Sequence, residues 1–454
     1  MRRQFDRLQA LYLRVFDTDF MRRIVRNSSY LVSATVFAAG LGFVQGVLQG
    51  RLLGPGGLGL LAAIATFSNT LNRLTSFRID ELVVRYVRLY QERGQQQRAA
   101  AVFKLASLLE VLGASTAFLL ILWLAPLGVR YFSDASGTEQ WFILYGTLTI
   151  INLVYDSSDG MLQVFDKFGV KAVIDIIQSL VRLGLTLGVY FSGGGLFEII
   201  LAELAGRLVR SVGVVGMALR TARQEWGASW WRTPLSVLRE ERRSLLTFAF
   251  STNLSATISL VAKDSEDLWV NGFLGNVIGG YYNLARTLNG LLQIPVSPLP
   301  ATTYPELSRA VAQNDWTNVR SVLRKGSMLA AAYSLPVTAG LILFGRPLIE
   351  RVWGLEFSPA YEPLVVLLLG FSFVNIFYWN RAALLAFNRP VYPTLVNFAG
   401  MLLKVGGILL FASTYGAMGF AALLVGYYLF TVGLAVVRVL NDVRRNLAPE
   451  QAAA

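Results

Sequence analysis

Charged residues lie inside stretches of this sequence that are otherwise apolar enough to cross a membrane. A charged side chain at membrane depth costs about 2.5 to 3.5 kcal/mol on insertion scales, so it faces a polar cavity or a partner. Guanidinium and ammonium groups that are withdrawn from water pair strongly with phosphate oxygens. The cations that we expect to line a phosphate-binding cavity are Arg73, Arg182, Lys263, Arg286 and Lys404.

Four acidic residues in the same stretches are candidate sites for a coupling ion: Asp156, Asp159, Asp264 and Asp267. Asp156 and Asp159 are three residues apart, a spacing that places both on one face of a helix. Lys263 and Asp267 are four apart and could pair within their helix. Two interpretations stay open for these acids: binding of H⁺ or Na⁺ that drives a transport cycle, or hydrogen bonding between helices.

Several kinds of chemistry are excluded by what the sequence lacks. It contains no Cys and no His, which excludes disulfides, thiolate metal sites, nucleophilic Cys and imidazole proton shuttles. It also has no glycine-rich loop followed by Lys and Ser or Thr, so ATP hydrolysis is not expected. We therefore expect no catalytic residues, no metal and no cofactor.

The composition is that of a membrane protein. Of 454 residues, 54% are hydrophobic and only 15% charged, and the mean hydropathy is +0.51. Runs of about 20 apolar residues predict membrane-spanning helices. The twelve predicted spans cover residues 28–50, 58–77, 105–125, 141–162, 172–191, 197–219, 246–270, 278–299, 327–345, 361–379, 391–413 and 419–440.

Basic residues are distributed unevenly between the two sets of loops. With the N-terminus inside, the inner segments hold 30 Lys and Arg and the outer loops hold 4. This asymmetry predicts that both termini are cytoplasmic. It also accounts for most of the net charge of +13 without a nucleic-acid partner.

An offset of 221 or 222 residues relates the two halves of the sequence. Leu53-Gly54 aligns with Leu274-Gly275, and Arg182 aligns with Lys404. A constant offset at equivalent positions indicates duplication. Six spans per half place both halves in the same orientation, related by an axis along the membrane normal. The predicted division is an amphipathic cytoplasmic segment 1–27, a first bundle 28–220, an interfacial linker 221–244, a second bundle 245–440 and a cytoplasmic tail 441–454.

Four stretches resemble polysaccharide-biosynthesis flippases of the multidrug/oligosaccharidyl-lipid/polysaccharide (MOP) exporter superfamily: "RNSSYLVSATVFAAGLGFVQGVLQGRLLGPGGLG", "DLWVNGFLGNVIGGYYNLARTL", "PLIERVWGLEFSPAYEPLVVLLLG" and "YGAMGFAALLVGYYL". The resemblance implies an all-α, V-shaped pair of six-helix bundles. It also implies transfer of a polyprenyl-pyrophosphate-linked oligosaccharide from the inner to the outer leaflet of the cytoplasmic membrane. The implied partners are the bilayer, the lipid-linked glycan, a polymerase and glycosyltransferases.

Aromatic and amide residues in the tenth span are candidate glycan contacts, although a role in the membrane core or interface stays open. They are Asn375, Tyr378, Trp379 and Asn380.

Three alternatives to a lipid-linked oligosaccharide flippase remain. A multidrug antiporter of the same superfamily would need an acidic or neutral aromatic cavity, whereas we expect several unmatched cations. A lipid II flippase often has two further helices after the twelfth, which this sequence lacks. A membrane glycosyltransferase or polymerase would place catalytic carboxylates or arginines on substantial outer loops, but the outer loops 51–57, 192–195 and 415–418 are short and carry no carboxylate.

Overall fold

The computed structural model describes residues 19–76, 79–135, 137–241, 243, 245 and 257–452. Side chains are not described for residues 19–35, 412–413 and 448–452. The described part is helical and contains no strand. Most of the predicted segment 1–27 and the start of the seventh span lie outside the described residues.

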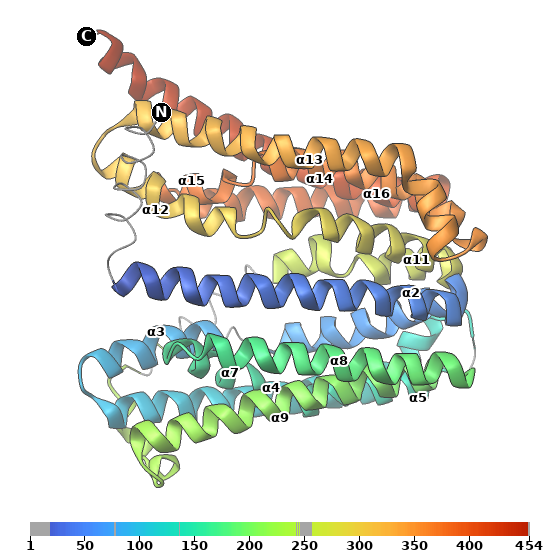
Figure 1. The fold of residues 1–454 in the computed structure, drawn as a ribbon, viewed down its shortest axis with the longest axis horizontal. Coiled ribbons are helices and arrows are strands. Elements are labelled where there is room, and N and C mark those ends of the chain that lie inside the picture. Colours follow the sequence, from blue (N-terminus) through green and yellow to red (C-terminus); the bar gives the residue numbers. More distant parts are fainter. Residues whose placement is uncertain are drawn as a thin grey trace, which may run out of the picture.

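The first half of the chain forms one group of helices, coloured blue to green in Figure 1. These helices are α2 (Asp19–Thr75), α3 (Ile79–Glu92), α4 (Gln96–Phe132), α5 (Glu139–Gly146), α6 (Leu148–Ile151), α7 (Tyr155–Val164), α8 (Phe168–Ser192) and α9 (Leu196–Trp226). A linker with two short 3₁₀ turns, η1 (Trp230–Arg232) and η2 (Leu235–Leu238), follows and packs against α4.

The second half forms the other group, coloured yellow to red. Its elements are η3 (Leu260–Asp264), which is a π-helical turn, α11 (Glu266–Gln293), α12 (Leu299–Ala312), α13 (Trp316–Val352), η4 (Leu355–Ala360), α14 (Tyr361–Ile376), α15 (Asn380–Ala386) and α16 (Val391–Ala452). Figure 1 shows α2 and α11 next to each other between the two groups, and these two helices form the main contact between the halves.

Seven segments of the described chain are long and apolar enough to cross a membrane. One of them, Val36–Thr75, contains two passes because α2 turns at Gly54. The remaining passes are more polar or consist of shorter helices in series. The expected multi-pass fold of about twelve helices in two bundles is confirmed.

The turn at Gly54 recurs at Gly275, which belongs to the repeated Leu-Gly phrase in the second half. Both residues have positive φ, 63° and 81°, and both interrupt a long helix. Only glycine adopts this backbone conformation without a steric cost from Cβ. Other positive-φ residues repeat at offsets of 217 to 223: Gly94 and Asn314, Gly137 and Gly354, Asp166 and Asn388, and Gly193 and Gly416. The duplication inferred from the sequence is therefore present in the backbone.

The fourth and tenth spans, predicted as continuous helices, are each broken. Asn152–Val154 separates α6 from α7, and Phe377–Trp379 separates α14 from α15. The break before α7 is stabilised by the buried carboxylate of Glu110, which accepts hydrogen bonds from the backbone N–H groups of Asp156 (2.6 Å) and Ser157 (2.9 Å). These donors at a helix start have no partner within the helix, so a carboxylate from α4 satisfies them.

The halves are joined at the end that carries the turns at Gly54 and Gly275, called the Gly54 end below. There the α2 and α11 backbones pass so closely that a Cβ on Gly59 would lie 1.9 Å from the carbonyl oxygen of Asn276. A Cβ on Gly280 would lie 1.9 Å from that of Pro55.

Polar bonds close the same end. Arg51 donates to the carbonyl oxygens of Val352 (2.6 Å) and Arg351 (2.8 Å). The Asp134 carboxylate accepts from the backbone N–H of Asn276 at 2.6 Å, across the two halves. The opposite end, with the turns at Asp166 and Asn388, is called the Asp166 end.

We expect Gly280→Ala to weaken the contact between the halves, because its methyl group would overlap the Pro55 carbonyl. Overpacking of this kind costs about 1 to 3 kcal/mol or more, so the melting temperature in detergent should fall by several degrees. Gly290→Ala is the matched control, since it lies on the same helix with nothing within 4 Å of the new methyl group. Equal melting temperatures for the two variants would contradict the close approach.

Candidate functional site

Ion pairs at the seam between the halves are built by a short segment around the π-helical turn η3. Arg73 on α2 donates to Asp264 in η3, which links the first half to the second. Arg286 pairs with Asp267 at 2.9 Å on α11, and the hydroxyl of Thr66 lies 3.4 Å from the same carboxylate. The seam is therefore a charged cluster with contributions from both halves.

The π-helical turn explains why neighbouring acids reach different partners. A π turn inserts a residue into the helical repeat and so rotates the side chains that follow. Asp264 points to Arg73, Glu266 to Lys404, and Asp267 to Arg286. The Lys263 to Asp267 pair that the spacing of four allowed is replaced by the pair with Arg286, because the helix is interrupted at Ser265.

Lys404 is enclosed in the second half. Its side chain is 1% exposed and pairs with Glu266, which is fully buried. The ammonium group also donates to the carbonyl oxygen of Ala262 at 2.6 Å, and the Tyr282 hydroxyl donates to Glu266 at 2.9 Å. A buried charge with such a complete set of partners is held in place.

Arg182 occupies the equivalent place in the first half. Its Nε donates to Gln45 Oε1 at 2.5 Å, and Nη1 lies 3.3 Å from Glu203. The amide groups of Gln45 and Gln49 donate to the same Glu203 carboxylate, at 2.8 and 3.0 Å. Gln45 stands 221 residues before Glu266, so the two residues occupy equivalent positions. The cation of each half therefore contacts the same position, which is a neutral amide in the first half and a carboxylate in the second.

The expectation of several unmatched cations is wrong for Arg73, Arg182, Arg286 and Lys404, since each has a carboxylate partner. The partners were missed because they lie 19 to 191 residues away in sequence. Polar residues within apolar runs, such as Gln45 and Glu203, were the available signal. Lys263 is half-buried and has no ion-pair partner among the described residues.

A polar cavity of about 440 Å³ lies in the first half beside the seam. It is lined by Asn69, Asn72, Arg73, Ser76, Asp80, Asn152, Tyr155, Asp156, Arg207 and Arg210. We call it the Arg73 cavity. Its amides and arginines suit both sugar hydroxyls and phosphate oxygens.

Arg207 and Arg210 of the Arg73 cavity are not among the cations that the sequence predicted to line a phosphate-binding cavity. Arg210 pairs with Asp175 at 2.7 Å and lies 5.0 Å from the centre of the Tyr155 ring. The Nε of Arg207 is buried and has no hydrogen-bond partner among the described residues. Arg207 is thus a donor with capacity for a ligand.

The two predicted ion-coupling acids on α7 have different surroundings. Asp156 lines the Arg73 cavity, whereas Asp159 pairs with Lys171 at 2.6 Å and accepts from Gln163 at 2.8 Å. Asp156 is therefore placed to meet a solute or ion, and Asp159 is engaged within its own half.

The predicted glycan residues lie in the second half, where their polar groups contact other residues of that half. Trp379 is 2% exposed and donates to Ser327 at 2.7 Å, and the Tyr378 hydroxyl lies 2.9 Å from that of Thr303. The amide of Asn375 is also buried, and that of Asn380 donates to the Phe377 carbonyl at 2.8 Å. The structure does not bring this group together with the seam cluster.

Removing only the lysine from the Lys404–Glu266 pair should be costly, because it leaves a buried carboxylate without its counter-charge. We expect Lys404→Met to destabilise the protein by about 3 to 5 kcal/mol, seen as reduced yield and melting temperature. Adding Glu266→Gln should recover most of the loss, since Gln still accepts from Tyr282. Lys263→Met is the control. A double variant as unstable as Lys404→Met would refute this pairing.

Comparisons with known proteins agree with this architecture. The sequence profile of the family described as "polysaccharide biosynthesis protein" matches residues 24–311. The inner membrane protein YghQ of Escherichia coli (strain K12) is 23% identical over 345 residues, which is 75% of this chain and 95% of that protein.

Solved structures share the fold at low sequence identity. An inward-facing multidrug-resistance MATE family transporter of the MOP superfamily superposes with a TM-score of 0.74 at 13% identity, covering 90% of this chain and 95% of that one. The lipid II flippase MurJ, in an inward closed conformation, gives 0.69 at 15% identity, covering 92% and 89%. The chain therefore belongs to the polysaccharide biosynthesis protein family, and it is a multi-pass membrane protein with the fold of the MOP superfamily.

Proposed function

We propose that the protein is a secondary flippase that moves a polyprenyl-phosphate- or pyrophosphate-linked oligosaccharide from the inner to the outer leaflet of the cytoplasmic membrane. The observation that carries this proposal is the Arg73 cavity, a polar chamber lined by three arginines beside the seam of the two bundles. Family membership supports a glycan as the cargo. No covalent chemistry is required of the chain.

The anionic head group is proposed to contact Arg73 and Arg207 first. The side chain of Arg73 is 55% exposed although it already pairs with Asp264, so a phosphate can approach it. Arg207 has a buried donor without a partner among the described residues. Sugar hydroxyls would then meet the amides of Asn69, Asn72 and Asn152.

Alternating access follows from competition at the seam. A phosphate that takes Arg73 from Asp264 removes one of the links between the halves. Protonation of Asp264 or Asp267, or Na⁺ binding there, would release Arg73 or Arg286 in the same way, which is how an ion gradient could drive the cycle. A ligand shifts the two states only as far as its differential affinity for them.

Arg182 and Lys404 were expected to contact the phosphate, but we propose a structural role for them instead. Both are satisfied by carboxylates within their own halves. We assign them to holding the spans of each half together while the halves move. Lys263, which lies near the seam, is the further cation available to the diphosphate.

The orientation of the protein in the membrane determines the side from which it would take its cargo. The distribution of basic residues supports cytoplasmic termini, which places the Asp166 end in the cytoplasm and the Gly54 end outside. The halves are joined at the Gly54 end, so this conformation would receive its cargo from the cytoplasmic side. Glycosyltransferases that build the glycan and a polymerase that consumes it are the proposed partners.

A cation-coupled multidrug antiporter is the second candidate, because carboxylates neutralise the seam cations that were expected to be free. The fold shared with the multidrug-resistance transporter fits this alternative as well. The fold of MurJ likewise keeps lipid II among the substrates to be tested. Transport measurements separate the three.

Reconstituted vesicles with a fluorescent polyprenyl-pyrophosphate sugar test the flippase directly. Arg73→Gln and Arg207→Gln should each slow flipping about tenfold or more, because a hydrogen bond to a charged group contributes about 1.5 to 3 kcal/mol. Arg320→Gln removes an exposed cation that is far from the cavity residues in sequence. This control variant should flip the sugar lipid at the wild-type rate.

The same vesicles are assayed with a labelled lipid II and with a cationic dye under H⁺ and Na⁺ gradients. Normal sugar-lipid flipping by an Arg73→Gln/Arg207→Gln variant would remove the cavity from the mechanism. Gradient-driven dye transport without sugar-lipid flipping would establish the antiporter instead.

A further inference from the structure

A small polar pocket lies at the Asp166 end of the second half, between the residues just before η3 and the helices α15 and α16. It is lined by Ile258, Ser259, Arg381, Leu385, Pro390, Pro393, Thr394 and Asn397. Its volume of about 80 Å³ exceeds what one water needs. We call it the Arg381 pocket.

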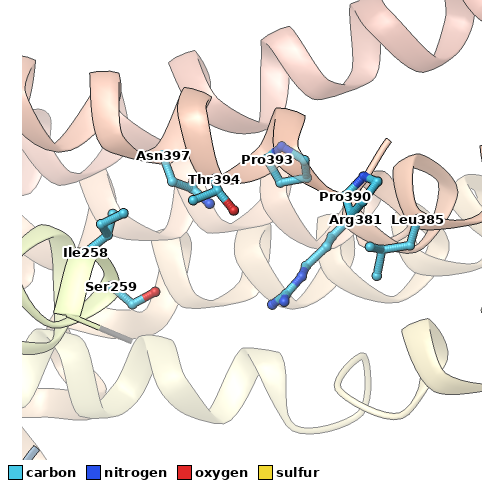
Figure 2. Close-up of a pocket in the computed structure, with 8 residues that line it drawn as sticks. All are labelled: Ile258, Ser259, Arg381, Leu385, Pro390, Pro393, Thr394 and Asn397. Atoms are coloured by element: carbon cyan, nitrogen blue, oxygen red, sulfur yellow. The ribbon is translucent and has the colours of Figure 1, made fainter. Parts of the chain in front are cut away.

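Side chains with free hydrogen-bond donors converge in the Arg381 pocket. Figure 2 shows the guanidinium group of Arg381 extending into the space between Ser259 on one side and Thr394 and Asn397 on the other. Within the described chain no residue pairs with Arg381 or hydrogen-bonds to the hydroxyls of Ser259 and Thr394. Asn397 accepts from Tyr427 through Oδ1 at 3.2 Å, which leaves its NH₂ group free to donate. None of the described residues that line the pocket is a carboxylate.

The duplicated first half shows what normally fills this place. At the offset of 222, Arg381 corresponds to Asp159 and Pro393 to Lys171, and those two residues form an ion pair at 2.6 Å. The register is exact here, because Asp166 and Asn388 make the same left-handed turn beside both places.

A second ion pair of the first half is also missing from the second. Asn397 corresponds to Asp175, which pairs with Arg210 at 2.7 Å. At these two places the first half has carboxylates, and the second half has Arg381 and Asn397. A positive group that faces a pocket thus stands where the first half has an internal ion pair.

We propose that the Arg381 pocket binds the phosphate group of an anionic ligand, separately from the Arg73 cavity and whether or not the protein is a flippase. A guanidinium group, two hydroxyls and an amide NH₂ group can all donate to phosphate oxygens. The size of the pocket suits a phosphate and is too small for an oligosaccharide. The apolar walls formed by Ile258, Leu385 and the two prolines suit the start of a lipid chain, so a phospholipid head group fits as well as a free phosphate.

Thermal unfolding of the purified full-length protein in a neutral detergent tests the site. Phosphatidylglycerol, phosphatidylcholine, inorganic phosphate and inorganic pyrophosphate are titrated separately. A ligand that binds only the folded state stabilises it by an amount that grows with the logarithm of the ligand concentration relative to its Kd, and the melting temperature rises accordingly. We expect an anionic ligand to raise the melting temperature of the wild type. The Arg381→Gln variant should require a ligand concentration about tenfold higher, or more, for the same rise.

Two further variants make the result decisive. Asn397→Asp keeps an acceptor for Tyr427 but supplies Arg381 with an internal carboxylate, so it should weaken binding without removing any cation. Arg320→Gln removes an exposed cation outside the pocket and should bind as the wild type does.

The ligand arms identify the source of the phosphate. Stabilisation by phosphatidylglycerol alone, lost in Arg381→Gln and Asn397→Asp, assigns the pocket to a lipid head group. Stabilisation by phosphate or pyrophosphate, lost in the same variants, assigns it to a soluble anion. Wild-type responses to every anionic ligand in both pocket variants would overturn the proposal, as would equal losses in Arg320→Gln.

Discussion

A charge at membrane depth needs a counter-charge or a polar cavity, and the arrangement of this protein depends on that requirement. Three pairs each connect a different set of helices: Arg182 with Glu203, Lys404 with Glu266, and Arg73 with Asp264. The first two bind helices within a half, and the third binds one half to the other. Two of the pairs therefore hold a bundle together, and one links the two bundles.

The two halves share one backbone plan but distribute charge differently. Arg182 and Lys404 make the same contact with the first helix of their half, yet Gln45 is neutral where Glu266 is charged. The first half compensates with Glu203 from α9. At the Asp166 end the charges differ as well, because Asp159 pairs with Lys171 in the first half, whereas the corresponding Arg381 has no ion-pair partner among the described residues. The two halves therefore share one scaffold and differ in a few buried or cavity-lining polar residues.

Breaks in helices place polar groups where a continuous helix would not. The end of α6 and the start of α7 bring Asn152, Tyr155 and Asp156 to the Arg73 cavity, and Glu110 satisfies the backbone donors that the break exposes. Irregular backbone at membrane depth is tolerated where it lines a cavity or is buried in protein. The π-helical turn η3 has a similar effect at the seam, since it directs three successive acids to three partners.

Local properties of the sequence determined the membrane spans, the duplication and the turns. Hydropathy depends on composition over about 20 residues, and a Leu-Gly phrase repeated at an offset of 221 marks positions where only glycine avoids strain. Which side chains become partners was decided by tertiary structure. The pairs of Arg182 and Lys404 and the capping of α7 by Glu110 all join residues from different helices. Helix packing sets those distances, and no local pattern encodes it.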